Sequence, residues 1–577
     1  MGAFDLVIRG ASVVDGTGAQ PRSADVAVHD GIITEIGSVD GSGRREIVVD
    51  GALLAPGFVD IHTHYDGQAT WDNQMLPSSW HGVTTVVFGN CGVGFAPVRA
   101  HDRDRLIELM EGVEDIPGTA LHEGLDWNWE SMSDFLDVLG TRNRDVDVAA
   151  QLPHGALRLY VMGERGANRE RATADDIAAM SRLTEEGIRA GALGFTTSRT
   201  KNHRTSTGAY TPSLTASHDE LIGIAEGVGR AGTGVLQMVS DLDPFEDELA
   251  LYEEMLVASG RPLSLSVAQN HRKPEEWRTV LAFIERMNAD GHSMRAQVAA
   301  RGIGVLLGLQ ATVNPLARSA TFQRVRAGER DLGAAVRALR DPSIKAAVVA
   351  ELADSLPGRN IGFDRVFLLG SKPDYEPEAG DSIEARARRD GRGPMDFLYD
   401  ELLAHDGTAL LYAPIINYAD GNLDHTGEML SHPYCVPGLS DGGAHVGTIC
   451  DASFPTTLLA HWGRDRQRGT LPLEQLVAAQ SRRTAETVGL LDRGVIAVGM
   501  RADLNVIDPS SVRVLAPEIR HDLPAGGRRL LQPAEGYLHT FVAGVETYAN
   551  GSFTGALPGR LVRGAKPRPN LATVGSA

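Results

Sequence analysis

Gly57-Phe58-Val59-Asp60-Ile61-His62-Thr63-His64 is the segment that decides the fold prediction. A β-type run, Gly57 to Ile61, is followed at once by two histidines spaced two residues apart. Because residues two apart on a strand face the same way, His62 and His64 project together from the carboxyl end of that strand. In a (β/α)₈ barrel this end of the strands carries the active site. Two imidazoles at this spacing suit a borderline divalent ion such as Zn²⁺, so the segment predicts a metal site at a barrel mouth.

Further along the chain, apolar β runs alternate with amphipathic helical stretches, which predicts parallel strands joined by helices. Thr173 and Ser217 are the expected N-caps of two of these helices, since acidic residues follow each of them. We expect eight barrel strands, at residues 57–61, 84–88, 146–152, 192–197, 234–239, 262–268, 294–298 and 437–440.

Both ends of the chain carry short β-rich runs separated by turn residues. They lie at residues 5–9, 11–15, 25–29 and 32–36, and again at 503–507, 538–542 and 546–548. The predicted fold class is therefore α/β, a TIM barrel with a small β-sandwich formed by both termini. The alternative is two independent β units, although the termini of a domain often lie close together.

The predicted domain division follows from these runs. The barrel takes residues 57–489, and residues 1–56 with 490–577 form the composite sandwich. A charged, helix-rich insertion at about 300–436 separates the seventh and eighth strands, either as a lid or as a helical decoration outside the chemistry. The Pro- and Gly-rich tail after Arg563 is expected to be disordered.

The composition points to a globular protein that acts on small molecules. The chain has 577 residues, 42% of them hydrophobic, and a formal net charge of -20 without a basic stripe, which argues against nucleic acid. It offers neither a membrane-spanning apolar run nor a signal peptide, and three irregularly spaced cysteines favour a reducing cytoplasm. A homo-oligomer is compatible with these features.

Cys91 lies in the glycine-rich segment that ends the second strand run, Phe88-Gly89-Asn90-Cys91-Gly92-Val93-Gly94. A packed, apolar cysteine is one interpretation. The other is a metal-ligating thiolate, because the ends of strands one and two are neighbours in a barrel. The residues alone leave both open.

Asp441 lies among glycines at the eighth strand end, in Leu439-Ser440-Asp441-Gly442-Gly443-Ala444-His445. An aspartate at this position can ligate a metal. It can also take a proton from water, since a metal lowers the pKa of its bound water towards about 7.

The chain resembles the N-acyl-D-amino-acid deacylase, or D-aminoacylase, branch of the amidohydrolase superfamily. The resemblance covers nearly the whole chain. It is carried by PGFVDIHTH (56–64), GNCGVGFAP (89–97), LPHGALR (152–158), GALGFTTS (191–198), SHP (431–433), SDGGAH (440–445) and GVIAVGMRADLNVID (494–508).

The resemblance implies zinc and hydrolysis of an N-acyl-D-amino acid to a carboxylic acid and a free amino acid. It makes His62 and His64 metal ligands, and Asp441 both a ligand and the general base. Cys91 becomes a ligand in place of the carbamylated lysine of other amidohydrolases, with Lys201 as the remaining lysine candidate. His154 is similar in placement to an active-site histidine of the family.

Two positions depart from the family pattern. Gln237 stands where strand five should end in a histidine, and Gln269 stands at the corresponding position of strand six, unless a short register shift brings His271 there. An amide oxygen is a poor zinc ligand beside imidazole, so the second metal site should be weak. We therefore expect one zinc ion rather than two, with manganese or iron as alternatives.

The basic residue that should hold a substrate carboxylate is missing after Asp441. Arg199, His203, Arg204 and Arg272 are the substitutes near strand ends, although a solvated arginine is the simpler interpretation of any one of them. The expected activity is metal-dependent hydrolysis of the amide bond of a small N-acylated substrate. The alternatives are an amidohydrolase acting on a cyclic imide, carbamate or peptide-like substrate, and a non-catalytic binding homologue.

Overall fold

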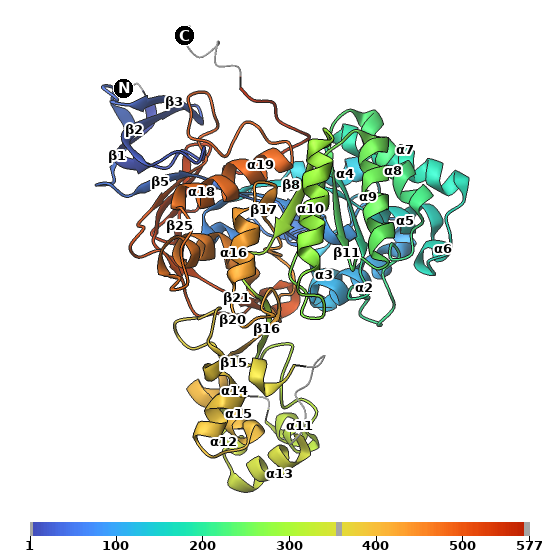
Figure 1. Ribbon diagram of the computed structural model, residues 1–577, viewed down its shortest axis with the longest axis vertical. Coiled ribbons are helices and arrows are strands. Elements are labelled where there is room, and N and C mark those ends of the chain that lie inside the picture. The colour runs from blue at the N-terminus through green and yellow to red at the C-terminus, as the bar shows by residue number, and fades with distance from the viewer. Residues whose placement is uncertain (1–3, 330, 353–360, 570–577) are drawn as a thin grey trace.

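A closed barrel of parallel strands forms the body of the protein in the computed structural model, which describes residues 4–329, 331–352 and 361–569 (Figure 1). Two parallel sheets build the barrel wall, and β8 continues into β9 to join them. In order around the wall the strands are β6 (Phe58–Asp60), β7 (Val83–Phe88), β8 (Asp147–Ala150) with β9 (Leu152–Pro153), β10 (Gly194–Arg199), β11 (Val235–Ser240), β12 (Leu263–Ser266), β13 (Met294–Val298) and β17 (Cys435–Pro437).

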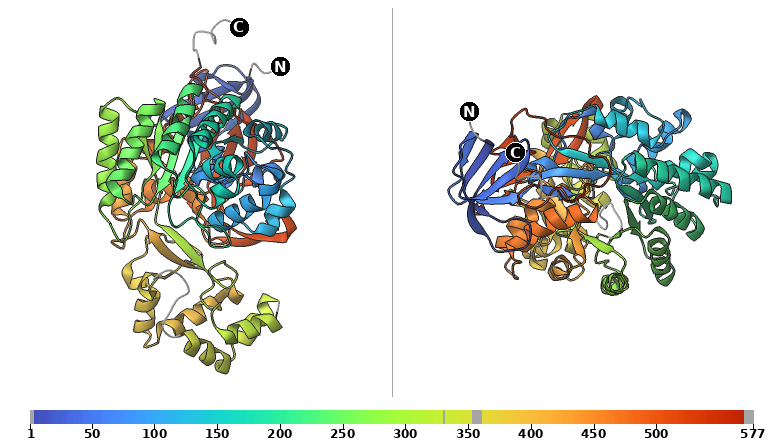
Figure 2. Two further views of the ribbon diagram at one scale, coloured as in Figure 1. Left: turned by 90° about the vertical axis from the view of Figure 1, so that its right-hand side faces the viewer. Right: turned by 90° about the horizontal axis from the view of Figure 1, so that it is seen from above.

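The barrel and its eight strand positions are confirmed, with one shifted boundary. The eighth strand ends at Pro437 instead of beginning there, because Gly438 and Leu439 already leave the sheet and Leu439 has a positive φ of 58°. Helices cover the outside of the wall (Figures 1 and 2). They are α1 (Gln68–Trp71), α2 (Arg103–Glu114), α3 (Gly118–Gly124), α4 (Met132–Gly140), α5 (His154–Met162), α6 (Glu164–Ala167), α7 (Ala174–Ala190), α8 (His218–Ala231), α9 (Phe245–Ser259), α10 (Glu276–Ala289), α16 (Asp424–Ser431), α17 (Phe454–Thr457), α18 (Leu473–Ala478) and α19 (Thr484–Thr487).

The expected helix starts are also observed. Thr173 caps α7 through a reciprocal pair of hydrogen bonds with Asp176. Ser217 occupies the N-cap position of α8, but its hydroxyl makes no capping bond. Within the described residues, every helix falls short of the length and apolarity that crossing a membrane requires.

Residues 303–416, between β13 and α16, form a lobe that projects from the barrel (Figures 1 and 2). The antiparallel strands β14 (Ile303–Leu307), β15 (Phe367–Leu368) and β16 (Leu411–Ile416) connect it to the body. Its hydrophobic core, which includes Phe322, Val336 and Leu398, is separate from that of the barrel. The lobe helices are α11 (Ala320–Gly328), α12 (Leu332–Leu339), α13 (Pro342–Leu352), α14 (Ile383–Arg389) and α15 (Pro394–Leu402).

Strands from the two ends of the chain share one sheet of nine strands. Its join is the antiparallel pairing of β5 with β18, while β1 pairs with the other edge of β5. From the first part of the chain come β1 (Phe4–Val13), β2 (Arg22–His29), β3 (Ile32–Gly37), β4 (Gly43–Val48) and β5 (Leu53–Pro56), and from the last part β18 (Leu504–Ile507), β23 (Tyr537–Val542), β24 (Val545–Ala549) and β25 (Ser552–Phe553). The further division of the chain into a sandwich and a barrel at residues 56 and 490 stays a prediction.

Two shorter strand pairs lie between β18 and β23 in the sequence. They are β19 (Arg513–Val514) with β22 (Ala534–Glu535), and β20 (Glu518–Leu523) with β21 (Gly527–Leu531). The first part of the tail after Arg563 is ordered, contrary to expectation, because the backbone of Lys566 bonds to Gly489 and Leu491. Residues 570–577 lie outside the described residues.

A buried charge network fastens the barrel to the C-terminal segment. Arg493 donates to Asp147 of β8 at 2.7 Å and to Thr85 of β7 at 2.8 Å. Arg501 pairs with both Asp147 and Asp503, at 3.0 and 3.1 Å. Arg493, Asp147 and Asp503 are each at most 3% exposed, so the network lies inside the protein.

Candidate active site

The first and last barrel strands meet at the residues predicted to bind metal. Thr63 forms a parallel bridge with Gly442. The backbone N–H of Asp441 donates to the carbonyl of His62 at 3.1 Å, and that of His64 donates to Gly442 at 2.8 Å. The closure of the barrel therefore places His62 and His64 beside Asp441.

Cys91 reaches the same place through a tight turn, η2 (Asn90–Gly92), that follows β7. Gly89 has a φ of 85°, and a Cβ on it would lie 2.5 Å from the carbonyl oxygen of Gln151, so only glycine fits there. Thr196 of β10 holds the turn from the other side by accepting from the N–H of Gly92 at 3.1 Å. Cys91 itself has a φ of 55°, an unusual value for a residue with a side chain.

His62, His64 and Cys91 have potential ligand atoms within 4.8 Å of one another, and Asp441 contacts both histidines. We call these four residues the ligand cluster. His62 Nε2 lies 3.3 Å from Cys91 Sγ and 3.5 Å from Asp441 Oδ1. His64 Nε2 lies 3.7 Å from the same carboxylate oxygen. The two histidines are 1% exposed and Cys91 is 7% exposed. The structure thus brings together the four side chains that were named from the strand ends.

The spacing of these atoms fits a divalent metal ion. Tetrahedral zinc with ordinary Zn–N, Zn–O and Zn–S bonds places neighbouring ligand atoms about 3.3–3.6 Å apart. The observed separations of 3.3, 3.5 and 3.7 Å are close to these edges. Two imidazoles, a thiol and a carboxylate are also the donor types that zinc prefers.

The negative charges around the ligand cluster also favour the binding of a cation. Burial raises the pKa of the Cys91 thiol well above its usual range, and the negative charges of Glu114, Asp441 and Asp66 raise it further. Burial lowers the pKa of His62 and of His64. This effect outweighs the negative charge of Asp441, which raises the pKa of both histidines. The two imidazoles are therefore neutral, the form that ligates a metal, and a divalent ion held here would favour the thiolate form of Cys91.

Gln297 of β13 fixes the orientation of His62, a contact that the sequence did not indicate. Its Oε1 lies 2.7 Å from His62 Nδ1, while its Nε2 donates to Ser264 at 2.9 Å. The amide oxygen therefore faces the ring, and His62 Nδ1 carries the hydrogen. The lone pair of His62 Nε2 then points to Cys91 and Asp441. A polar residue inside an apolar barrel strand was the available clue.

Glu114, the last residue of α2, is the second functional neighbour that sequence reasoning missed. Its Oε1 lies 3.2 Å from His64 Nδ1, and its Oε2 lies 3.5 Å from His445 Nε2. Burial raises the pKa of Glu114 well above its usual range, and the charges of Asp441 and Asp66 add to that effect. No local pattern marks it, because a glutamate at the end of an amphipathic helix is ordinarily solvated.

The two glutamines and His271 do not join the ligand cluster in the described contacts. Gln237 is 1% exposed, and its Oε1 has no hydrogen bond. Gln269 is held by the loop that follows β16, since its Oε1 accepts from Ala419 at 3.1 Å and its Nε2 donates to Asp420 at 3.0 Å. His271 contacts Arg365 of the projecting lobe.

His154 lies apart from the ligand cluster, at the start of α5. It is fully buried, with Nδ1 2.8 Å from the Thr197 hydroxyl and Nε2 3.0 Å from Glu220 Oε1. Arg158 pairs with the same carboxylate at 2.8 Å. Both ring nitrogens of His154 are therefore engaged by protein groups, and these contacts lend no support to the predicted catalytic role.

Of the predicted substrate-binding residues, His203 is held by Ser198, whose hydroxyl oxygen lies 2.8 Å from its Nδ1. Burial lowers its pKa to about 3, and the charges of His445 and His64 contribute. Arg199 is engaged by Glu248 at 2.7 Å, and Arg204 stacks on the Tyr210 ring at 3.9 Å. Arg272 is exposed.

Lys201 is exposed as well, and it pairs with Asp243 at 2.9 Å. It is therefore not placed with the ligand cluster, and a carbamylated Lys201 has no support from the structure.

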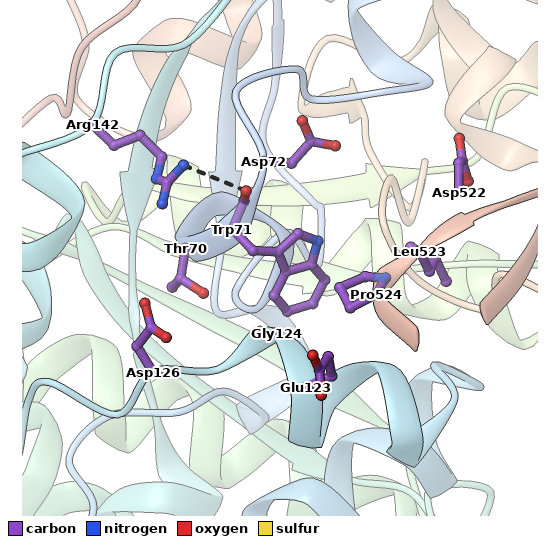
Figure 3. Close-up of a pocket in the computed structure, with 10 residues that line it drawn as sticks. All are labelled: Thr70, Trp71, Asp72, Glu123, Gly124, Asp126, Arg142, Asp522, Leu523 and Pro524. Atoms are coloured by element: carbon purple, nitrogen blue, oxygen red, sulfur yellow. Dashed lines mark hydrogen bonds between the residues drawn. The ribbon is translucent and has the colours of Figure 1, made fainter. Parts of the chain in front are cut away.

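The ligand cluster does not line the larger of the two cavities described below. A cavity of about 20 Å³ lies against Asp441 and Asp451 under β21. A larger cavity of about 510 Å³ lies elsewhere, between α1, the end of α3 and the β20–β21 hairpin (Figure 3). There Arg142 donates to the carbonyl oxygen of Trp71 at 3.4 Å. None of the residues that line it belongs to the ligand cluster.

Comparison with known proteins identifies the family. The sequence profile of the amidohydrolase family matches residues 46–551, which is most of the chain. The chain belongs to the amidohydrolase family. Hydrolysis of carbon–nitrogen amide bonds is accordingly its class of chemistry, and its likeness is to the D-aminoacylase branch.

Individual relatives support this placement. A D-aminoacylase of Alcaligenes xylosoxydans xylosoxydans is 27% identical over 585 residues and covers 97% of both chains. An N-acyl-D-aspartate deacylase of the same organism is 32% identical over 271 residues, covering 47% of this chain and 49% of its own. A solved D-aminoacylase structure with a binuclear metal centre, where one metal activates and the second attenuates, superposes with a TM-score of 0.64. It is 26% identical and covers 97% of this chain and 100% of its own.

Proposed function

We propose that this amidohydrolase cleaves the amide bond of a small N-acylated amino acid, with Asp441 as the general base. The observation that carries the proposal is the convergence of His62, His64, Cys91 and Asp441 at the mouth of the barrel. The D-aminoacylase and the N-acyl-D-aspartate deacylase among the similar proteins support an N-acyl-D-amino acid as the substrate.

The ligand cluster is the proposed holder of one divalent ion, with zinc preferred. When bound, such an ion supplies Lewis acidity, which acidifies water and polarises the acyl carbonyl. The chain contributes the orientation. Gln297 sets the tautomer of His62, and the turn at Cys91 brings the thiol within 3.3 Å of the ring.

Asp441 is the residue suited to move the proton. Burial alone raises its pKa, but the nearby rings of His64, His62 and His445 lower it well below its usual range. Its carboxylate is therefore ionised at neutral pH and can accept the proton of the attacking water. The same oxygen can then deliver that proton to the nitrogen of the leaving amine.

The substrate assignment is tested with the zinc-loaded protein and a panel of N-acetyl amino acids in both D and L forms. We expect release of free amino acid from members of the D series, and loss of that release after chelation of the metal. Turnover of the L series alone would contradict the stereochemical part of the proposal. No turnover of any member by metal-loaded protein would contradict the substrate class.

A neutral substrate is the second candidate, because the arginines predicted to hold a carboxylate have other partners. Arg199 is paired with Glu248, and Arg204 lies over Tyr210. A cyclic imide, carbamate or peptide-like amide needs no such anchor. Hydrolysis of a cyclic imide at a higher kcat/KM than any N-acetyl amino acid would favour this candidate. A protein that binds members of the panel without turnover would be a non-catalytic homologue.

We expect about one tightly held divalent ion per chain. The resemblance to the D-aminoacylase branch puts Gln237 and Gln269 at the two positions where that branch has histidines, and amide oxygens hold zinc weakly. Elemental analysis after extensive dialysis should therefore find a molar ratio near one. The double variant Gln237→His/Gln269→His should raise the ratio. Two equally firm ions in the unaltered protein would show that the glutamines do not weaken the second site.

Cys91→Ala is expected to reduce metal affinity or turnover at least about tenfold, equivalent to ~1.4 kcal/mol. Alanine keeps the Cβ and hence the same backbone constraint at positive φ, so the change removes only the sulfur. The matched control is Cys435→Ala, which removes another buried thiol, located on β17. If Cys91→Ala kept the zinc content and the turnover of the unaltered protein, Cys91 would be a packing residue and not a ligand.

A further inference from the structure

Glu114 has a position that the proposed reaction does not use. It ends α2, the helix after β7, and its side chain is 1% exposed. Among the described residues, neither of its carboxylate oxygens has a hydrogen bond, and the same is true of His64 Nδ1. A buried carboxylate without a partner is costly, so its retention beside a predicted metal ligand needs an explanation.

The unpartnered atoms lie next to one another. Glu114 Oε1 and His64 Nδ1 are 3.2 Å apart, and the opposite ring nitrogen, Nε2, faces Asp441. His64 therefore lies between two carboxylates, one on the ligand side and one behind it. Gln297 occupies the equivalent position behind His62, at 2.7 Å from its Nδ1. Both histidines of the pair thus have an oxygen atom behind the ring, a carboxyl oxygen for His64 and an amide oxygen for His62.

A second set of contacts joins the end of α2 to the loop that carries Asp441. The N–H of His445 donates to the carbonyl of Glu114. The N–H of Gly447 donates to Asp115 Oδ2 at 3.1 Å, and Thr312, at the start of the projecting lobe, donates to Asp115 Oδ1 at 3.3 Å. The backbone at Glu114 and Asp115 is therefore fixed on both sides, so the Glu114 side chain has a defined place behind His64.

We propose that Glu114 is a positioning residue for the metal centre: it accepts the Nδ1 hydrogen of His64 and so presents Nε2 as the ligand atom. A carboxylate behind a ligating histidine fixes its tautomer and raises its basicity, and loss of such a partner typically weakens metal binding 10–100-fold. The inference rests on the proposed metal-dependent function. It concerns how tightly this chain holds its ion and does not depend on which amide is cleaved.

The test compares Glu114→Gln and Glu114→Ala with Glu108→Gln, a change of an exposed glutamate on the same helix. The measured quantity is the zinc dissociation constant, obtained by competition with a chromophoric chelator. We expect it to rise about 10–100-fold in Glu114→Ala and less in Glu114→Gln, whose amide oxygen still accepts a hydrogen bond. Glu108→Gln should match the unaltered protein.

Thermal unfolding of the metal-free proteins separates positioning from a merely structural role. Glu114→Gln replaces a buried acid by a neutral side chain of the same shape, so its metal-free midpoint should equal or exceed that of the unaltered protein. A lower metal-free midpoint with unchanged zinc affinity would overturn the proposal, as would unchanged affinity in both Glu114 variants. Failure of the unaltered protein itself to bind zinc would instead refute the proposed metal-dependent function.

Discussion

Asp441→Asn is expected to fold normally and to keep substantial metal while its turnover falls at least about a hundredfold. Asparagine preserves the shape of the side chain but cannot accept the proton of water. Loss of general acid and base action typically costs about 10²–10⁴ in rate, equivalent to ~3–5 kcal/mol. His62, His64 and Cys91 remain to hold the ion, because Asp441 is one of four members of the ligand cluster. Turnover and zinc content must therefore be measured on the same sample.

The control is Asp219→Asn, which changes an exposed aspartate of α8 paired with Arg171. It should retain the turnover of the unaltered protein. Near-normal turnover in Asp441→Asn would show that another group takes the proton. Loss of all metal together with activity would support Asp441 as a ligand and contradict the expectation that the ion is retained without it.

Arg493→Met is expected to lower the free energy of unfolding by about 3–5 kcal/mol. Removing one partner from a buried ion pair leaves the other charge without compensation, which is far more costly than losing a surface pair. Here Asp147 and Asp503, which lie 2.7 Å and 3.8 Å from Arg493 Nη1, would keep only Arg501 as a neighbouring cation. Methionine keeps most of the apolar volume, so the loss reports the charge rather than a cavity.

Urea unfolding followed by tryptophan fluorescence measures this effect, after recovery on dilution has been verified. Arg182→Met provides the comparison, since Arg182 forms an exposed i,i+4 pair with Glu186 whose removal should cost at most about 1 kcal/mol. If the two variants were equally stable, the junction between the barrel and the C-terminal segment would not depend on Arg493.

The barrel could be predicted because most of its strands have a recognisable local sequence pattern. Runs such as Thr84 to Phe88 are apolar, β-branched and followed by glycine, and each lies between amphipathic helices. The predicted eighth strand was displaced because Cys435 to Pro437 is only three residues long and ends in a proline that Gly438 follows, a pattern typical of a turn. Its place is set by parallel pairing with β13, which is a tertiary contact.

The terminal sheet shows a similar division. The runs at 5–9 and 11–15 are one strand, β1, with an irregularity between Ile8 and Ala11 where Gly10 has a positive φ. A glycine at positive φ resembles a turn in the sequence, and only the pairing with β2 distinguishes a bulge from a turn.

The ligand cluster could be predicted because strand ends in a barrel converge, so residues distant in sequence can be assigned to one point. Glu114 and Gln297 could not be predicted in this way. Glu114 reaches the site from the end of a helix, and Gln297 acts through a ring nitrogen that faces away from the ligands. Contacts behind the ligands depend on packing, for which a sequence offers no spacing rule.

Strand β5 pairs on one side with β1 and on the other with β18, which is synthesised much later. At about 5–20 residues per second, a ribosome takes roughly twenty seconds to a minute and a half to pass from residue 56 to residue 504. During that interval one edge of β5 has no strand to pair with, and open edges invite pairing with other chains. The open edge of β5 therefore has to be protected until β18 is synthesised and completes the sheet.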